Sequence, residues 1–347
     1  MKTILITGAA GFIGSNLVLN LLNTVSDAVI VGIDNLNDFY DVRLKEYRLR
    51  QIDNCAKNTE SKWIFRKGGI DNKDFVKSLF QEFNFDIVVN LAAQASARYS
   101  VTNPDVYIDS NINGFFNILE ACRQNKVGHL VFASSSSVYG GNTKIPFSEQ
   151  DKVDNPVSLY AATKKANELL AYSYSKLYNI PCTGLRFFTV YGPCGRPDMA
   201  YFSFTNKLVK RKKIQIFNYG RCKRDFTYID DIVKGVRLVI DKPPQTSVGD
   251  NGMPIPPYKI YNIGNNHPEI LLDFVTILKE ELVVAEVLPQ DYDLDQYIEL
   301  VPMQPGDVPV TYADTSALEK DFGFKPSTSL REGLHRFAVW YKEFYGE

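Results

Sequence analysis

The stretch Thr7-Gly8-Ala9-Ala10-Gly11-Phe12-Ile13-Gly14 decides the fold of this chain. It follows the apolar run from Thr3 to Thr7 and precedes a helical pattern from Ser15 to Leu22. Glycines at three-residue spacing between a strand and a helix allow a tight turn, and they let a pyrophosphate approach the free N–H groups at the helix N-terminus. The stretch therefore predicts the dinucleotide-binding turn of a βαβ unit.

A carboxylate in the expected place strengthens this prediction. The next apolar run begins at Val29 and ends at Asp34, twenty residues past Gly14. An acid there accepts hydrogen bonds from both hydroxyls of an adenosine ribose and repels a 2′-phosphate, so NAD is favoured over NADP as the cofactor. The alternative is a structural glycine turn followed by a surface aspartate that caps a loop.

Further along the chain, short apolar runs alternate with longer mixed segments. The runs are continuous, which is typical of strands that are covered on both faces of a parallel sheet. We expect strands at Thr3 to Thr7, Val29 to Asp34, Ile87 to Ala93, Leu130 to Ser135 and Cys182 to Phe187. Since the intervening stretches are long enough for crossover helices, the sequence predicts an α/β fold with a Rossmann-like, doubly wound parallel sheet.

The regular pattern ends near Phe188, where the chain becomes rich in glycine, proline and aromatic residues. A helix near Ile229 and a strand near Tyr258 then follow, separated by a proline-rich loop. We expect a cofactor-binding domain over residues 1–187, re-entered at about 227–264, and a smaller C-terminal α/β domain that binds the substrate over residues 188–226 and 265–347.

The composition is that of an ordinary globular protein. Of the 347 residues 45% are hydrophobic, and 39 basic against 40 acidic side chains leave a formal charge of −1. This balance excludes a disordered chain and provides no overall field for nucleic acid, and the basic run 210–213 is short enough to be a solvated helix end.

Several signals of export or metal binding are missing from the sequence. Apolar runs stay well below the ~18 residues of a membrane span, and the N-terminal apolar stretch is too short for a secretory signal. The five cysteines form no C-x-x-C pair, and none of the three histidines lies within five residues of a cysteine or of another histidine. We therefore expect a cytoplasmic protein with no membrane contact, no disulfide and no metal site.

A candidate catalytic base lies in the helical pattern that starts after Ser158. Tyr160 and Lys164 are four residues apart, so both side chains share one helix face and the ammonium can sit near the phenol. An adjacent cation favours phenolate and lowers the pKa of tyrosine, which makes it a usable base. Tyr172 and Lys176 repeat this spacing roughly 18 Å further along the helix, so the spacing alone does not decide between the pairs.

Tyr160 is favoured because it lies nearer the helix start. The strand at Leu130 also delivers the serine-rich stretch Ala133-Ser134-Ser135-Ser136-Ser137-Val138-Tyr139-Gly140 at its carboxyl end, where parallel sheets bind ligands. A hydroxyl there can hydrogen-bond a substrate oxygen and relay its proton. An ordinary polar loop is the alternative for the serines.

Seven motifs in order resemble the extended short-chain dehydrogenase/reductase family of nucleotide-sugar enzymes, from Lys2 to about Tyr345. They are T-G-A-A-G-F-I-G, L-A-A-Q at 91–94, S-S-S-S-V-Y-G, Y-A-A-T-K, R-F-F-T-V-Y-G-P at 186–193, R-D-F-T-Y-I-D-D at 224–231 and Q-P-G-D-V at 304–308. With I-D-N-L-N-D at 33–38 and G-R-P-D-M at 195–199, the resemblance implies NAD-dependent C4 epimerisation of a UDP-sugar. UDP-glucuronate is the expected substrate and UDP-galacturonate the product, formed through a transient 4-keto sugar with NAD tightly bound and recycled.

The resemblance also implies roles for individual residues. Catalysis falls to Ser135, Tyr160 and Lys164. Cofactor contacts fall to Gly8, Gly11, Phe12, Ile13, Gly14, Asp34, Asn35, Ile70, Leu91, Ala93, Gln94 and Lys164. Substrate contacts fall to Ser136, Ser137, Thr189, Arg196, Arg224 and Asp307.

Two positions depart from the family pattern. The segment expected to cover the adenine usually carries an acid, whereas here it reads Lys67-Gly68-Gly69-Ile70-Asp71, so that an adenine contact from Gly69 can come only from the backbone. Gln304 stands where related UDP-galactose epimerases have an arginine on the phosphates, which places more of the neutralisation on Arg224.

A uronic acid substrate requires the protein to control the orientation of its carboxylate. A 4-keto uronate is a β-keto acid that loses CO₂ when its carboxylate aligns with the carbonyl, so the carboxylate must be held out of alignment. A guanidinium suits this task because it forms two parallel hydrogen bonds, and Arg196 is our candidate, with Thr189 and the serines assisting. An ordinary loop arginine paired with Asp198 is the alternative.

Other activities remain open from the sequence. A 4,6-dehydratase is disfavoured, because it needs an acid pair where Ser136 and Ser137 stand. A UDP-glucuronate decarboxylase stays an alternative, although it is expected to carry an acid in the same segment, where none is present. A UDP-hexose or N-acetylhexosamine 4-epimerase and a non-catalytic NAD sensor are further alternatives, although a sensor has no need of Tyr160 with Lys164.

Two helical stretches, 104–124 and 159–178, carry more apolar residues than one sheet face requires. The resemblance implies that such helices pair across a two-fold axis, so we expect a homodimer with a four-helix interface.

Overall fold

A computed structural model describes residues 1–303 and 308–346. The chain forms two compact units. The first comprises residues 1–142, 149–187 and 233–262, and the second comprises residues 143–148, 188–232 and 263–347.

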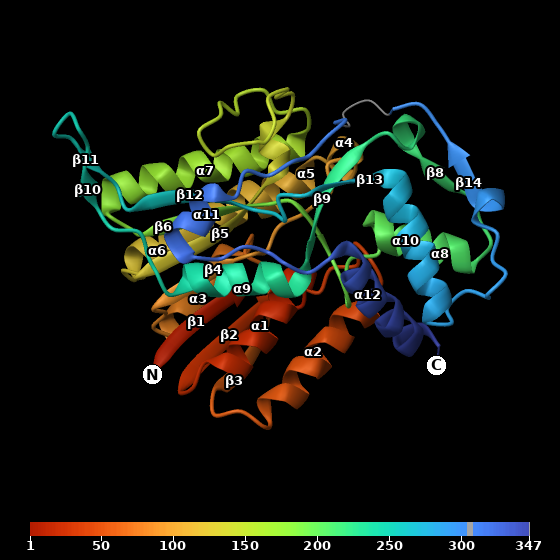
Figure 1. Cartoon of the computed structure of the whole chain (residues 1–347). Helices are drawn as coiled ribbons and strands as arrows, with labels where there is room; N and C mark the ends of the chain where they lie inside the picture. The colour runs from red at the N-terminus through yellow and green to blue at the C-terminus, as the bar shows by residue number, and fades with distance from the viewer. Residues whose placement is uncertain (304–307, 347) are drawn as a thin grey trace. The chain divides into compact units, whose positions relative to one another are not determined.

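The first unit is built on a seven-stranded sheet in the order β12-β6-β5-β4-β1-β2-β3 (Figure 1). Its strands are β1 (Lys2–Thr7), β2 (Ala28–Asp34), β3 (Lys62–Lys67), β4 (Ile87–Asn90), β5 (His129–Ser135), β6 (Cys182–Phe187) and β12 (Tyr258–Ile263). Neighbouring strands from β3 to β6 pair in parallel. The predicted Rossmann-like, doubly wound sheet is confirmed.

Crossover helices cover both faces of this sheet. They are α1 (Phe12–Thr24), α2 (Val42–Ala56), α3 (Lys73–Glu82), α6 (Phe115–Gln124) and α7 (Leu159–Tyr178). Because β4 lies on the opposite side of β1 from β2, right-handed crossovers place α1 and α2 on one face and α3, α6 and α7 on the other. The second group packs over a core that includes Leu5, Val88 and Phe132.

Three local features differ from the expected elements. Strand β3 was not expected, since it is a half-buried edge strand whose ends are both lysine. The stretch 104–124 contains α5 (Asp105–Tyr107) and a π-helix at Ile108–Gly114 before α6 begins. The proline-rich loop holds a short hairpin of β10 (Ser247–Val248) and β11 (Pro254–Ile255).

The second unit has a three-stranded sheet in the order β13-β9-β7 and a parallel pair of β14 and β8. Its strands are β7 (Thr189–Tyr191), β8 (Ile214–Ile216), β9 (Lys223–Tyr228), β13 (Pro268–Ile270) and β14 (Ile298–Leu300). Its helices are α8 (Ala200–Val209), α10 (Leu271–Val284), α11 (Ser316–Phe322) and α12 (Leu330–Tyr345), and α9 (Ile229–Ile240) leads the chain back to the first unit.

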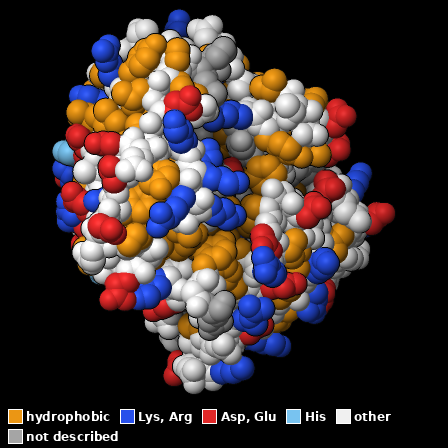
Figure 2. Space-filling model, turned by 90° about the vertical axis from the view of Figure 1, so that its right-hand side faces the viewer, with side chains coloured by type: hydrophobic (Ala, Val, Ile, Leu, Met, Phe, Trp, Pro, Cys, Tyr) orange, Lys and Arg blue, Asp and Glu red, His pale blue; other side chains and the backbone are white. Residues whose placement is uncertain are grey.

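An aromatic core holds the second unit together. Phe226 stacks on Phe274 at 4.3 Å between ring centroids, and Phe337 packs edge-on against Tyr201 at 4.8 Å. Figure 2 shows lysine, arginine, aspartate and glutamate side chains exposed on one face of the molecule together with apolar side chains. Among the described helices, none has the length and apolar character needed to cross a membrane.

Candidate active site

The glycine turn between β1 and α1 needs glycine where its backbone approaches other backbone atoms closely. Gly8 has φ +70°, a conformation that favours glycine, and a Cβ on it would lie 2.9 Å from the Ala92 nitrogen. A Cβ on Gly14 would lie 2.1 Å from the carbonyl oxygen of Gly8. Helix α1 starts at Phe12, directly after Gly11, and no described side chain caps its first N–H groups. The turn therefore fits a pyrophosphate at a helix N-terminus.

Asp34 lies at the end of β2, beside this turn. One carboxylate oxygen accepts from the Ala10 N–H at 3.1 Å and the other from the Leu36 N–H at 2.9 Å. The capping role of the alternative interpretation is thus present, but each oxygen retains a second lone pair for a ribose hydroxyl. The buried carboxylate fits an adenosine ribose without a 2′-phosphate.

Arg48 of α2 fixes the same turn from the other side, and the sequence analysis missed it. It is only 1% exposed and donates to the carbonyl of Ala10 at 2.9 Å and to the hydroxyl of Tyr40 at 2.6 Å. Its position on a charged helix gives little indication of burial. Arg48 therefore ties the loop after β2 to the glycine turn.

The other expected cofactor residues follow the ends of parallel strands. Phe12 and Ile13 form the first turn of α1, and Gln94 is held by two hydrogen bonds between its backbone and the side chain of Asn111. Because the carboxyl ends of parallel strands meet at one edge, the sheet gathers these residues there. The members that follow β2, β3 and β4 are Asn35, Ile70, Leu91, Ala93 and Gln94.

Helix α7 carries the candidate base. Its first turn is capped by Ser158, whose hydroxyl accepts from the Ala161 N–H at 3.1 Å. The Lys164 ammonium lies 6.0 Å from the centroid of the Tyr160 ring and donates to the carbonyl of Ala133 at 2.9 Å. The Tyr160 ring packs edge-on against Tyr107 at 6.1 Å. A cation is therefore held beside this phenol at the carboxyl end of β5.

The second tyrosine–lysine pair has different surroundings. Tyr172 is 46% exposed and packs edge-on against Tyr258, and Lys176 donates to the carbonyl of Pro254 in β11 at 2.7 Å. Lys176 thus contacts the short β10–β11 hairpin, whereas Lys164 contacts β5 of the central sheet. The contacts favour Tyr160 as the base.

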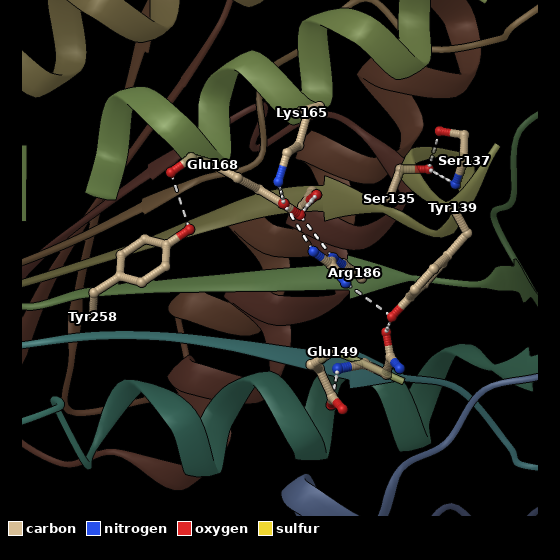
Figure 3. A network of polar contacts seen from close by, with 10 residues as sticks. Ser135, Ser137, Tyr139, Glu149, Lys165, Glu168, Arg186 and Tyr258 are labelled. Atoms are coloured by element: carbon tan, nitrogen blue, oxygen red, sulfur yellow. Dashed lines mark hydrogen bonds and ion pairs between the residues drawn. The ribbon is translucent and has the colours of Figure 1, made fainter. Parts of the chain in front are cut away.

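Ser135, the last residue of β5, is the third candidate catalytic residue. Its hydroxyl oxygen accepts from the N–H of Ser137 at 3.1 Å and from the Ser137 hydroxyl at 2.7 Å (Figure 3). With its oxygen engaged as an acceptor, the Ser135 hydroxyl has its own proton left to donate. Ser136 and Ser137 are both half-buried in the turn that follows β5.

The remaining expected substrate residues belong to the second unit. Thr189 begins β7, and Arg224 of β9 donates to the carbonyls of Lys223 and Pro309 at 3.0 and 3.3 Å. Arg196 forms two parallel hydrogen bonds with Asp198, at 3.0 and 2.6 Å, as the alternative interpretation expected. Gln304 and Asp307 lie outside the described residues.

Asp225, next to Arg224, is a buried acid that the sequence analysis did not single out. Its carboxylate accepts from the backbone N–H groups of Asn265, Asn266 and Ala313 at 2.7 to 3.1 Å. Burial raises the pKa of Asp225, although these three hydrogen bonds oppose the change. Asp225 therefore anchors β9 to two other segments of the second unit.

Burial of Lys164 makes folding depend on pH. Desolvation lowers the pKa of Lys164 from 10.5 to about 8, so the unfolded chain binds more protons here between these two pH values. The titration of Lys164 therefore increases the free energy of unfolding as the pH rises through this window. With the dinucleotide removed, we expect the unfolding free energy of wild type relative to Lys164→Met to rise by on the order of 2 kcal/mol from pH 7.5 to 10.

Urea unfolding of both proteins at several pH values measures this difference. Lys176→Met, which removes an exposed lysine from the same helix, provides the matched control and should give a difference that stays flat with pH. A flat difference for Lys164→Met as well would contradict a buried ammonium at this position.

Comparison with known proteins finds one matching family model and similar proteins over almost the whole chain. A sequence model described as the NAD dependent epimerase/dehydratase family matches residues 4–264. Protein CapI of Staphylococcus aureus is 47% identical over 348 residues, covering 99% of both chains. UDP-glucuronate 4-epimerase 4 of Arabidopsis thaliana is 45% identical over 350 residues, which are 99% of this chain and 76% of the relative.

A solved structure shares the architecture. The UDP-glucuronic acid 4-epimerase of Bacillus cereus, crystallised with UDP-glucuronic acid and NAD, is 32% identical with a TM-score of 0.83. The similarity covers 99% of this chain and 100% of that one.

Proposed function

The chain belongs to the NAD-dependent epimerase/dehydratase family, and from this membership we propose that it inverts C4 of UDP-glucuronate to give UDP-galacturonate. It is an NAD-dependent UDP-sugar 4-epimerase. The observation that best supports the chemistry is the buried Lys164 ammonium, fixed to the end of β5 beside the Tyr160 ring.

The chain's own residues perform the proton transfer. Lys164 stabilises the phenolate of Tyr160, which takes the proton from the C4 hydroxyl. Ser135 donates a hydrogen bond to O4 with its own proton, because its oxygen already accepts two hydrogen bonds from Ser137. The glycine turn and Asp34 hold the dinucleotide, and bound NAD supplies the hydride acceptor and, once reduced, the hydride donor for C4.

The uronic acid requires control of its carboxylate. We assign this to Arg196, with Thr189, Ser136 and Ser137 assisting. Because Arg196 already holds Asp198 in two hydrogen bonds, a substrate carboxylate has to compete for the guanidinium or use its other N–H groups. We assign the diphosphate to Arg224, and we keep Asp307 as a further contact to the nucleotide sugar.

Incubation of UDP-glucuronate with the purified protein and no added NAD tests this function. NMR should show UDP-galacturonate accumulating, because the cofactor is bound and recycled. UDP-xylose with CO₂ would identify a decarboxylase instead. No reaction with any UDP-uronate, UDP-hexose or UDP-N-acetylhexosamine would remove the epimerase proposal.

We also propose a homodimer that pairs α6 and α7 of two chains. Phe116 of α6 and Leu169 and Tyr172 of α7 are exposed apolar side chains, between 41% and 58% accessible. Light scattering of the purified protein should give twice the mass of 39.3 kDa, and a value of one chain would contradict the dimer. We place the protein in the cytoplasm, in keeping with the cysteines at positions 55, 122, 182, 194 and 222, which form no disulfide within the described residues.

A further inference from the structure

A buried ion pair underlies the serine segment, by which we mean residues 134–139. Glu168 of α7 and Arg186 of β6 form two parallel hydrogen bonds, at 2.8 and 2.9 Å (Figure 3). Both side chains are at most 4% exposed. Hydrogen bonds favour the charged guanidinium against the cost of burial, so the pKa of Arg186 is raised.

This pair holds both ends of the serine segment. At the start, the Ser134 hydroxyl donates to Glu168 at 2.7 Å. At the end, Arg186 donates to the Tyr139 hydroxyl at 3.0 Å, and that hydroxyl donates onward to Asn262 at 2.7 Å. We call these two hydrogen bonds, from Ser134 to Glu168 and from Arg186 to Tyr139, the tethers of the serine segment. Ser135 lies between the two tethered residues (Figure 3).

The pair also reaches the helix that carries the base. Glu168 follows Tyr160 and Lys164 at steps of four residues, so the three side chains lie along one face of α7. Lys164 donates to the carbonyl of Ala133, the residue before the serine segment. The helix with the phenol and the strand end with Ser135 are thus joined by successive polar contacts.

Stability alone gives little reason for such a pair. Removing two charges from water costs several kcal/mol per ion, and well-packed apolar residues often replace a buried ion pair without loss. The pair is better explained by the placement of the Ser134 and Tyr139 hydroxyls, because each hydrogen bond to the pair is directional. Burial also raises the pKa of Tyr139 to about 12, so its hydroxyl stays protonated and serves as a donor at neutral pH.

We propose that Glu168 and Arg186 are a positioning pair that sets the Ser135 hydroxyl against the Tyr160 phenol, acting through Ser134 and Tyr139. The proposal rests on the epimerase function above. Neither charged residue is assigned a contact with the substrate or the dinucleotide, so their effect should appear in the chemical step and not in binding.

Two variants cut the tethers while leaving the charges paired. Ser134→Ala removes the hydroxyl on Glu168, and Tyr139→Phe removes the hydroxyl on Arg186. We expect each to lower kcat about 5- to 30-fold, with KM for UDP-glucuronate within twofold of wild type and bound dinucleotide unchanged. A purely structural role predicts no such separation of kcat from KM.

A double-mutant cycle tests whether the tether acts through the carboxylate. Glu168→Gln keeps the shape of the side chain and should lower kcat by more than Ser134→Ala does. Adding Ser134→Ala to Glu168→Gln should then cost less than it does in wild type, since the two changes break one connection. Full additivity of the two effects would contradict the proposed connection.

Glu82→Gln is the matched control. It disrupts an exposed glutamate–arginine pair with Arg66 in the same unit and should leave kcat and KM unchanged. Wild-type kcat in both tether variants would overturn the proposal, as would a raised KM or loss of dinucleotide in place of a kcat effect. An absence of epimerase activity in wild type would instead remove the proposed function.

Discussion

Tyr160→Phe should lower kcat by at least about 10³-fold while the dinucleotide stays bound. The substitution removes only the phenol oxygen, so the ring keeps its packing against Tyr107 and Lys164 keeps its hydrogen bond to Ala133. The proton on the C4 hydroxyl then has no base of suitable pKa to receive it. Turnover of UDP-glucuronate and the nucleotide released on denaturation are the two measurements.

Tyr172→Phe is the matched control, because it removes the same atom from the second tyrosine–lysine pair on the same helix. We expect wild-type turnover from it, since Tyr172 is exposed and packs against Tyr258. If Tyr160→Phe retained near-normal turnover and Tyr172→Phe lost it, the base would have to be reassigned.

Gly14→Ala should abolish dinucleotide binding and lower the free energy of unfolding by at least about 2 kcal/mol. The added Cβ would lie 2.1 Å from the carbonyl oxygen of Gly8, a backbone atom that cannot move without displacing the turn. Because α1 would be displaced from β1, the N–H groups at its N-terminus would no longer point together at the pyrophosphate. Dinucleotide content after purification and urea unfolding measure the two effects.

Gly141→Ala separates this clash from the general effect of replacing a glycine. Among the described residues other than its two chain neighbours, no heavy atom comes within 4 Å of a Cβ at position 141. We therefore expect Gly141→Ala to keep its dinucleotide and its stability. A Gly14→Ala protein with full dinucleotide content would show that the turn is not the cofactor site.

The sheet was largely predictable because its central strands are buried on both faces. Strand β2, for example, is buried at all seven positions, and such strands leave continuous apolar runs in the sequence. The glycine turn was predictable for a related reason: only glycine fits so close to a neighbouring backbone. Strand β3 was not predicted, because it lies at the edge of the sheet, where it is half-buried and its composition is mixed.

The polar contacts behind the site were harder to foresee. Arg186 interrupts a buried apolar run, which signals that it needs a buried partner, but nothing in the sequence names Glu168 as that partner. The two residues come together because β5 and β6 are neighbours and α7 crosses between them. Arg48 likewise meets Ala10 only through the packing of α2 on α1.

The central claim is that hydrogen leaves C4 and returns to C4 of the same sugar within one site. UDP-glucuronate deuterated at C4, incubated with the protein in ordinary water, tests this claim most directly. We expect UDP-galacturonate that retains the deuterium at C4, as read by NMR and mass spectrometry. Product that carries solvent hydrogen at C4 would contradict the account.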